Sequence, residues 1–78
     1  MRFYFNLREG SDYISDEEGL DLPDLDAATD AALRGARDVL AGEVLKGRLP
    51  LSTVMEVSDE QGSRVLELPF GQVVSIDQ

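Results

Sequence analysis

The first residues of the chain alternate between apolar and polar side chains. The apolar side of "RFYFNL", residues 2–7, holds Phe3, Phe5 and Leu7. The polar side holds Arg2, Tyr4 and Asn6. A period of two is typical of a half-buried β-strand. Turn-forming residues around Gly10 and the short run "YIS" at 13–15 follow, so this part of the chain predicts a β-hairpin.

Between residues 23 and 50 the apolar period changes to that of an α-helix. The apolar stripe consists of Leu25, Ala28, Ala32, Ala36, Val39 and Leu40, flanked by Leu33 and Val44. Asp24 stands where an N-cap is expected, Gly47 fits the position after the last turn, and Pro50 prevents continuation. The pattern therefore predicts a helix over residues 25–46.

Alternation resumes in "LSTVMEVS", residues 51–58, and in "RVLELPF", residues 64–70, on either side of a turn at Gly62. Pro69 has no backbone N–H, so the last strand either ends there or lies on a sheet edge. Residues 71–76 fit either a further short strand or a segment folded back over the core. The predicted fold class is α+β with the order β-β-α-β-β, in which two hairpins form an antiparallel sheet and one helix packs on one face. We expect a single domain over residues 1–78.

Composition narrows the chemistry that the chain can perform. Its 42% hydrophobic and 29% charged residues are typical of a folded globular domain. It contains neither cysteine nor histidine, which excludes disulfides, thiolate or imidazole metal ligands, cysteine nucleophiles and histidine bases. The apolar stretch at the N-terminus is too short for a signal segment or a membrane span, so we expect a cytoplasmic protein.

The net charge limits the classes of partner that the chain can bind. Sixteen acidic residues against seven basic ones give a net charge of -9 at pH 7. This charge repels nucleic-acid phosphates and anionic lipid surfaces, so we expect neither a nucleic-acid nor a membrane partner. A second copy of the chain, forming a homodimer, and a basic protein are the partners we expect.

The stretch "SDEEGLDLPDLD", residues 15–26, concentrates six of the carboxylates around one glycine and one proline. A calcium-binding EF-hand loop needs oxygen ligands at its first and last positions. With Gly19 as the loop glycine, Asp16 and Glu18 fall correctly, but Ile14 and Leu25 occupy the two ends. The mismatch favours solvated loop charges followed by the approach to the helix; a docking surface for a basic partner and a divalent-cation site are the alternatives.

Glu43 falls near the centre of the apolar helix stripe, where an unpaired buried carboxylate is costly. Either it lies at the rim and pairs with an arginine, or it is a buried acid with a raised pKa that marks a site. Gly35 and Gly42, on one flank of the helix, are either merely tolerated or allow a second helix or strand to approach closely.

The sheet face opposite the helix is expected to carry Tyr4, Val54, Glu56, Val65 and Glu67. The candidate interaction surface combines part of this face with the acidic loop, as Tyr4, Asp16, Glu17, Glu18, Val54 and Val65. No catalytic, cofactor-binding or metal-ligating residue is assigned, and no cofactor is expected. These features predict a non-catalytic protein–protein interaction module. The alternatives are a regulatory domain that responds to a divalent cation or ligand and, third, a small enzyme with a carboxylate site.

Three stretches also resemble a known family. They are the aromatic first strand, "DEEGLDLPDLDAA" leading into a helix rich in alanine and arginine, and the "DEQG" turn before "LPF". In these features the chain resembles small acidic bacterial proteins grouped as domain of unknown function 6894. The resemblance covers nearly the whole chain and implies a bacterial, cytoplasmic protein, found especially in alphaproteobacteria. It supports the single-domain boundary and brings no activity, ligand or catalytic residue with it.

Overall fold

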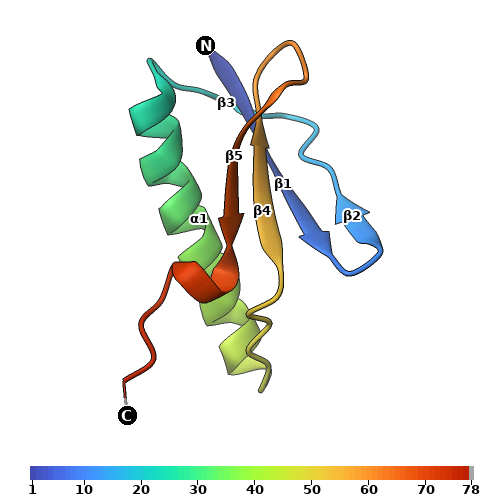
Figure 1. Ribbon diagram of the computed structural model, residues 1–78, viewed down its shortest axis with the longest axis vertical. Coiled ribbons are helices and arrows are strands. Elements are labelled where there is room, and N and C mark those ends of the chain that lie inside the picture. The colour runs from blue at the N-terminus through green and yellow to red at the C-terminus, as the bar shows by residue number, and fades with distance from the viewer. Residues whose placement is uncertain (78) are drawn as a thin grey trace.

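One long helix lies against an antiparallel sheet in residues 1–77, the part of the chain that the computed structural model describes (Figure 1). The elements are β1 (Arg2–Glu9), β2 (Asp12–Ile14), β3 (Leu20–Asp21), α1 (Leu25–Leu45), β4 (Val54–Ser58), β5 (Arg64–Pro69) and the 3-10 helix η1 (Phe70–Gln72). The sheet order is β2-β1-β4-β5, and β3 also pairs with β1. The predicted α+β fold, with two hairpins and one helix on one face, is confirmed.

Strand β1 organises the sheet because both of its edges are paired. One edge pairs with β4 from Tyr4 to Arg8. The other edge is shared by two short strands, β2 opposite residues 7–9 and β3 opposite residues 2–3. Between them, residues 4–6 of β1 face the loop that connects β2 to β3. The sequence did not predict β3, since two residues are too few to show a period.

Both ends of α1 are closed as the sequence predicts. Asp24 Oδ1 accepts a hydrogen bond of 2.9 Å from a first-turn N–H. At the other end Gly47 has a φ of +84°, and its N–H donates to the Val44 carbonyl at 2.9 Å. The Arg48 N–H donates to the Glu43 carbonyl at 2.9 Å, which completes a Schellman motif. The helix therefore ends at the last turn that the sequence predicts.

The core lies between α1 and the sheet. It consists of Phe3, Ala28, Ala32, Ala36, Leu40, Met55, Val57, Phe70 and Val73. Alanines on the buried helix face let the helix backbone come close to the large side chains of the sheet. Leu25 and Val44, which the sequence assigns to the apolar stripe and its flank, are 46% and 53% exposed. That assignment was wrong because the 21-residue helix is longer than the strands beneath it.

The last strand departs from simple alternation. Ser58 pairs with Arg64 and Val57 pairs with Leu66, so Val65 is the extra residue of a β-bulge. Val65 packs against the core cluster, and the prediction that it points away from the helix was wrong. Beyond Pro69, where β5 ends at the sheet edge, η1 carries Val73 back into the core. Of the two alternatives for residues 71–76, the strand does not form: residues 71–73 fold back over the core, and residues 74–76 lie outside it.

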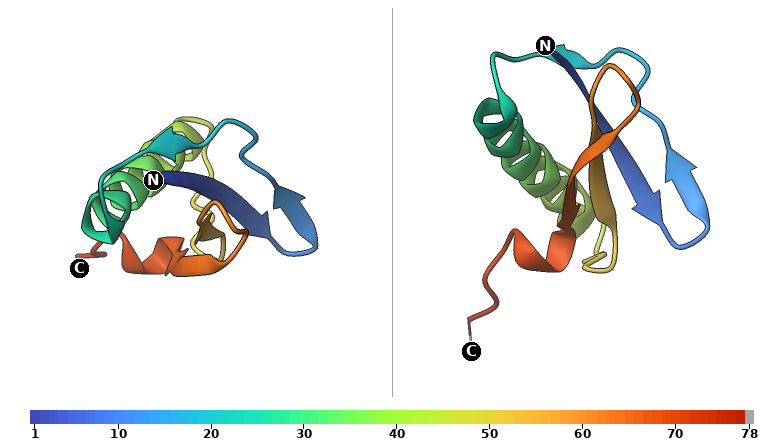
Figure 2. Two further views of the ribbon diagram at one scale, coloured as in Figure 1. Left: turned by 90° about the horizontal axis from the view of Figure 1, so that it is seen from above. Right: turned by 45° about the horizontal axis from the view of Figure 1, so that its top comes forward.

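The sheet has one covered and one open face. Figure 2 shows α1 against one side of the twisted sheet, with the β1–β2 hairpin extending beyond the helix. All three residues of β2 are accordingly exposed. After Val73 the chain leaves the core beside the C-terminal half of α1 (Figure 1).

Candidate functional site

Glu56 is the centre of the open sheet face. It points away from the helix, yet its side chain is only 8% exposed because two arginines cover it. Its Oε2 lies 2.8 Å from Arg8 Nε and 3.4 Å from Arg64 Nη1. Arg8 also lies over the Tyr13 ring, 4.7 Å from its centre, and Arg64 continues to Glu67 at 3.3 Å. The polar residues of this face are thus bound to one another.

The pKa values of this cluster reflect that pairing. The hydrogen bond from Arg8 lowers the pKa of Glu56 below its ordinary value, against the opposing effect of burial. The same hydrogen bond raises the pKa of the Arg8 guanidinium. A carboxylate that stays ionised and saturated with donors stabilises the sheet and is a poor proton acceptor for catalysis.

Asp16, in the acidic loop, takes the place of a strand. Where residues 4–6 of β1 have no strand partner on that edge, Asp16 Oδ2 accepts the Phe5 N–H at 3.0 Å. Its Oδ1 accepts the N–H groups of Glu18 and Gly19, both at 3.2 Å. The Asp16 N–H in turn donates to Asn6 Oδ1 at 2.9 Å. Asp16 is half-buried and structural, so the interpretation of this residue as a solvated loop charge was wrong.

The environment of Asp16 keeps it ionised. Burial raises its pKa, but hydrogen bonds from the backbone N–H groups of Phe5, Gly19 and Glu18, with the charge of Arg2, outweigh burial and lower it below the ordinary value. Asn6 is buried as well and donates to the Glu56 carbonyl at 3.1 Å and to Ser58 Oγ at 3.3 Å. The loop is therefore tied through Asn6 to β4.

The remaining acids of the stretch serve separate purposes. Asp21 pairs with Arg2 at 3.0 Å, Asp24 caps α1, and Glu17 is exposed. Within residues 1–77, no group of three or more His, Cys, Asp or Glu side chains is arranged to hold a metal ion. The carboxylates that looked like a cluster in the sequence do not converge in space.

The six residues of the predicted surface do not form one patch. Tyr4 and Asp16 line a shallow polar groove of about 420 Å³, together with Tyr13, Asp59 and Glu60 among others. Glu17 and Glu18 are exposed but do not line it. Val54 lies at the far end of β4, opposite Arg8, whereas Tyr4 lies opposite Ser58. Val65 packs on the core, as described above.

Glu43 belongs to a link between the helix end and the sheet. Its side chain is 25% exposed and lies 3.4 Å from Arg48 Nε and 3.9 Å from Lys46 Nζ. Arg48 also pairs with Glu9 at 3.1 Å, and Glu9 accepts the Thr53 hydroxyl at 3.2 Å. The prediction that Glu43 lies at the rim and pairs with an arginine is confirmed. Gly35 and Gly42, on one flank of the helix, do not share a role. A Cβ at Gly35 would touch Met55, whereas one at Gly42 would meet open space.

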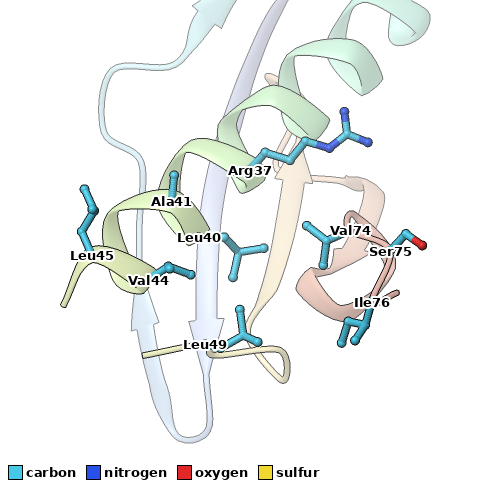
Figure 3. Close-up of a pocket in the computed structure, with 9 residues that line it drawn as sticks. All are labelled: Arg37, Leu40, Ala41, Val44, Leu45, Leu49, Val74, Ser75 and Ile76. Carbon is cyan, nitrogen blue, oxygen red and sulfur yellow. The ribbon is translucent and has the colours of Figure 1, made fainter. Parts of the chain in front are cut away.

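An apolar groove lies between the C-terminal half of α1 and the tail that follows η1 (Figure 3). Its volume is about 640 Å³. It is lined by Arg37, Leu40, Ala41, Val44, Leu45, Leu49, Val74, Ser75 and Ile76. Five of these apolar side chains are substantially exposed: Val44 (53%), Leu45 (89%), Leu49 (54%), Val74 (38%) and Ile76 (61%). We refer to these nine lining residues as the apolar groove.

One polar contact fixes the distance between the two walls of the groove. Arg37 Nε donates to the Val73 carbonyl at 2.8 Å, which joins α1 to the start of the tail. The buried Val73 side chain holds the same point in the core. The wall formed by residues 74–76 is therefore attached to the helix at its base.

The sequence did not predict the apolar groove, although it contained a signal for it. Val44 was assigned to the flank of the core stripe, and Val74 and Ile76 lie in the segment whose conformation the sequence left open. The signal was an excess of large apolar residues at 44, 45 and 49, next to the predicted helix end and beyond the reach of the sheet.

Comparisons with known proteins give one match. Residues 2–71 match the model of a family described as Domain of unknown function (DUF6894), which covers most of the chain. No curated protein and no solved structure matches the chain. Across residues 1–77, no helix is long and apolar enough to span a membrane.

Proposed function

The chain belongs to the DUF6894 family, and we propose that it works as a non-catalytic protein–protein interaction module. The observation that carries this proposal is the apolar groove, with its five exposed large apolar side chains. Contiguous apolar surface of this kind is typical of protein interaction sites on small domains. Asp16 of the acidic loop and Glu56 of the open sheet face support the fold, since both carboxylates already have partners within the chain.

The energetics favour a protein as the occupant. Burying one large apolar side chain completely contributes roughly 1.5–3 kcal/mol. Association costs about 4–15 kcal/mol in lost translational and rotational freedom. A partner must therefore cover most of the five exposed side chains together, which needs a complementary macromolecular surface.

The chemistry of the lining supports a binding role over a catalytic one. The polar side chains in the groove are Arg37 and Ser75, and the other seven lining residues are apolar. Arg37 is a donor that keeps its proton, so it is not a general base, and it already donates to the Val73 carbonyl. The Ser75 hydroxyl donates to Asp77 Oδ1 at 3.1 Å, and Asp77 is an exposed carboxylate outside the groove lining.

Site-specific photocrosslinking tests the proposal. The photoreactive amino acid benzoylphenylalanine replaces Leu45 in the full chain, which is then produced in cells and irradiated. Leu45 is the most exposed of the groove side chains, so we expect the substitution to leave the fold intact. We expect one discrete crosslinked product of higher mass. The matched control places the same amino acid at Leu25, which is 46% exposed at the opposite end of α1.

A second variant ties the crosslink to the apolar groove. Val74→Asp places a charge on the wall opposite the helix, and we expect it to abolish the product formed from position 45. Absence of any product at position 45, or an equal product at position 25, would contradict the proposed function.

A further inference from the structure

We infer that the occupant of the apolar groove is a second copy of this chain, bound across a two-fold axis. The inference rests on the proposed function and names the partner for the same site. Its basis is that an apolar recess on the helix and an exposed apolar side chain, Leu45, lie on one continuous surface of the molecule. Three observations carry it: the shape of the helix wall, the projection of Leu45, and the local charge.

The helix wall of the apolar groove has the spacing of a hole in knobs-into-holes packing. It consists of Arg37, Leu40, Ala41 and Val44, which are residues i, i+3, i+4 and i+7. Four residues at this spacing form the recess that receives one apolar side chain from a neighbouring helix. Ala41 is the small member of the four and leaves the recess open towards solvent.

Leu45 supplies the side chain for such a recess. It is the most exposed large apolar residue of the chain, at 89%, and it stands at the outer margin of the groove, away from the tail (Figure 3). Because Leu45 and the recess lie on the same surface, a two-fold axis that passes between them near Ala41 places each Leu45 in the recess of the other copy. Such a contact is isologous and closes at two chains.

The charge around the groove permits this contact in spite of the overall acidity. Residues 34–49 contain four of the seven basic residues but two of the sixteen acidic ones, a local charge of +2 within a chain of -9. The basic residues are Arg34, Arg37, Lys46 and Arg48, and the acidic ones are Asp38 and Glu43. The strong repulsion between two acidic chains is therefore weakest at this face, and a basic partner gains least from binding here.

Sedimentation equilibrium of the full chain tests the inference. We expect a reversible monomer–dimer equilibrium with no larger species. Leu45→Glu is expected to raise the dimer dissociation constant at least about tenfold, because it buries a carboxylate in the partner's recess. Leu25→Glu, the same change at an exposed leucine on the other end of α1, is expected to leave the dissociation constant unchanged. Circular dichroism establishes that both variants are folded.

The absence of cysteine from the chain permits an independent test of the axis. The single substitution Ala41→Cys, next to the axis, is expected to give a disulfide-linked dimer under mild oxidation. Leu45→Cys, one helical turn from the axis, and Leu25→Cys are not. A strict monomer at all concentrations, a dimer unaffected by Leu45→Glu, or failure of Ala41→Cys to crosslink overturns the inference. If the photocrosslinked product at position 45 contains a different protein, the second copy is the wrong partner but the proposed function stands.

Discussion

Gly19 is the residue at which backbone conformation and packing constrain the sequence together. Its φ is +72°, in the left-handed region, and an added Cβ would lie 2.9 Å from both the Phe3 carbonyl oxygen and Tyr4 Cε1. We expect Gly19→Ala to lower the free energy of unfolding by about 2–4 kcal/mol, from backbone strain plus displacement of β1. Urea denaturation measures this loss.

Gly10 provides the control for that prediction. Its φ is +62°, but no atom beyond its two chain neighbours lies within 4 Å of its added Cβ. Gly10→Ala therefore carries the backbone cost alone, about 1–2 kcal/mol. Equal losses at the two positions would show that the contact with β1 does not constrain residue 19.

Asp16 and Glu56 predict how stability depends on pH. Both have a folded-state pKa below the ordinary values of 3.8 and 4.5, so in acid the unfolded chain binds more protons than the folded one. Their contribution is fully present above the ordinary values and is lost as the pH falls through the lowered ones. We expect the urea midpoint to be level near neutrality and to fall in this acidic range.

Single substitutions test which carboxylate causes the loss of stability in acid. Asp16→Asn removes a carboxylate that accepts three backbone N–H groups, and we expect a loss of about 1–3 kcal/mol at pH 7 and a shallower fall in acid. Glu17→Gln changes an exposed neighbour and is expected to alter neither. If the two variants behaved alike, the N–H contacts of Asp16 would not account for the pH dependence.

At the scale of elements, the helix start makes a measurable contribution. Asp24 caps α1 through its carboxylate, so we expect Asp24→Ala to cost about 1 kcal/mol of unfolding free energy. Asp30→Ala removes an exposed aspartate from the interior of the same helix and is expected to change stability by less than about 0.5 kcal/mol. Thermal unfolding of both variants compares them. A loss at Asp30 as large as that at Asp24 would mean that helix charge, and not the cap, is responsible.

The elements that the sequence predicted correctly are those with several consistent local signals. Helix α1 has a 3.6-residue period, an N-cap and a C-terminal glycine, and each hairpin has alternation around a glycine turn. Strand β3 has two residues, and its pairing depends on Arg2, which donates to the Glu18 carbonyl and to Asp21. Val65 was predicted on the wrong face of the sheet because the pairing between two strands decides where a bulge forms. The alternation within one strand contains no sign of it.

The candidate site was less predictable than the fold because it depends on contacts between segments that are far apart in the sequence. The charge of the acidic loop was evident in the sequence. The backbone N–H groups that donate hydrogen bonds to the Asp16 carboxylate, however, belong to β1 and to the loop itself. The apolar groove needs two facts that no local pattern contains. One is that α1 extends past the sheet, and the other is that Val73 anchors the tail next to the helix.

At the scale of the whole molecule, the negative charge lies almost entirely outside the segment that lines the apolar groove, and this distribution affects self-association. Outside residues 34–49 the chain has fourteen acidic and three basic residues. In the proposed dimer, this acidic part repels the second copy over about one Debye length, while apolar contact in the groove opposes that repulsion. The proposed self-association is thus a balance between a short-range attraction and a longer-range repulsion.

That balance predicts a direction for the effect of salt. Raising the ionic strength from about 0.01 M to about 0.15 M shortens the Debye length from about 30 Å to about 8 Å. The repulsion between copies is screened while the apolar contact is not, so we expect the dimer dissociation constant to fall with added salt. Sedimentation equilibrium at the two salt concentrations measures the change, with Leu45→Glu as the variant expected to stay largely monomeric in both. Association that weakened with salt would instead indicate contact between opposite charges, such as the acidic loop of one copy against the basic residues beside the groove of another.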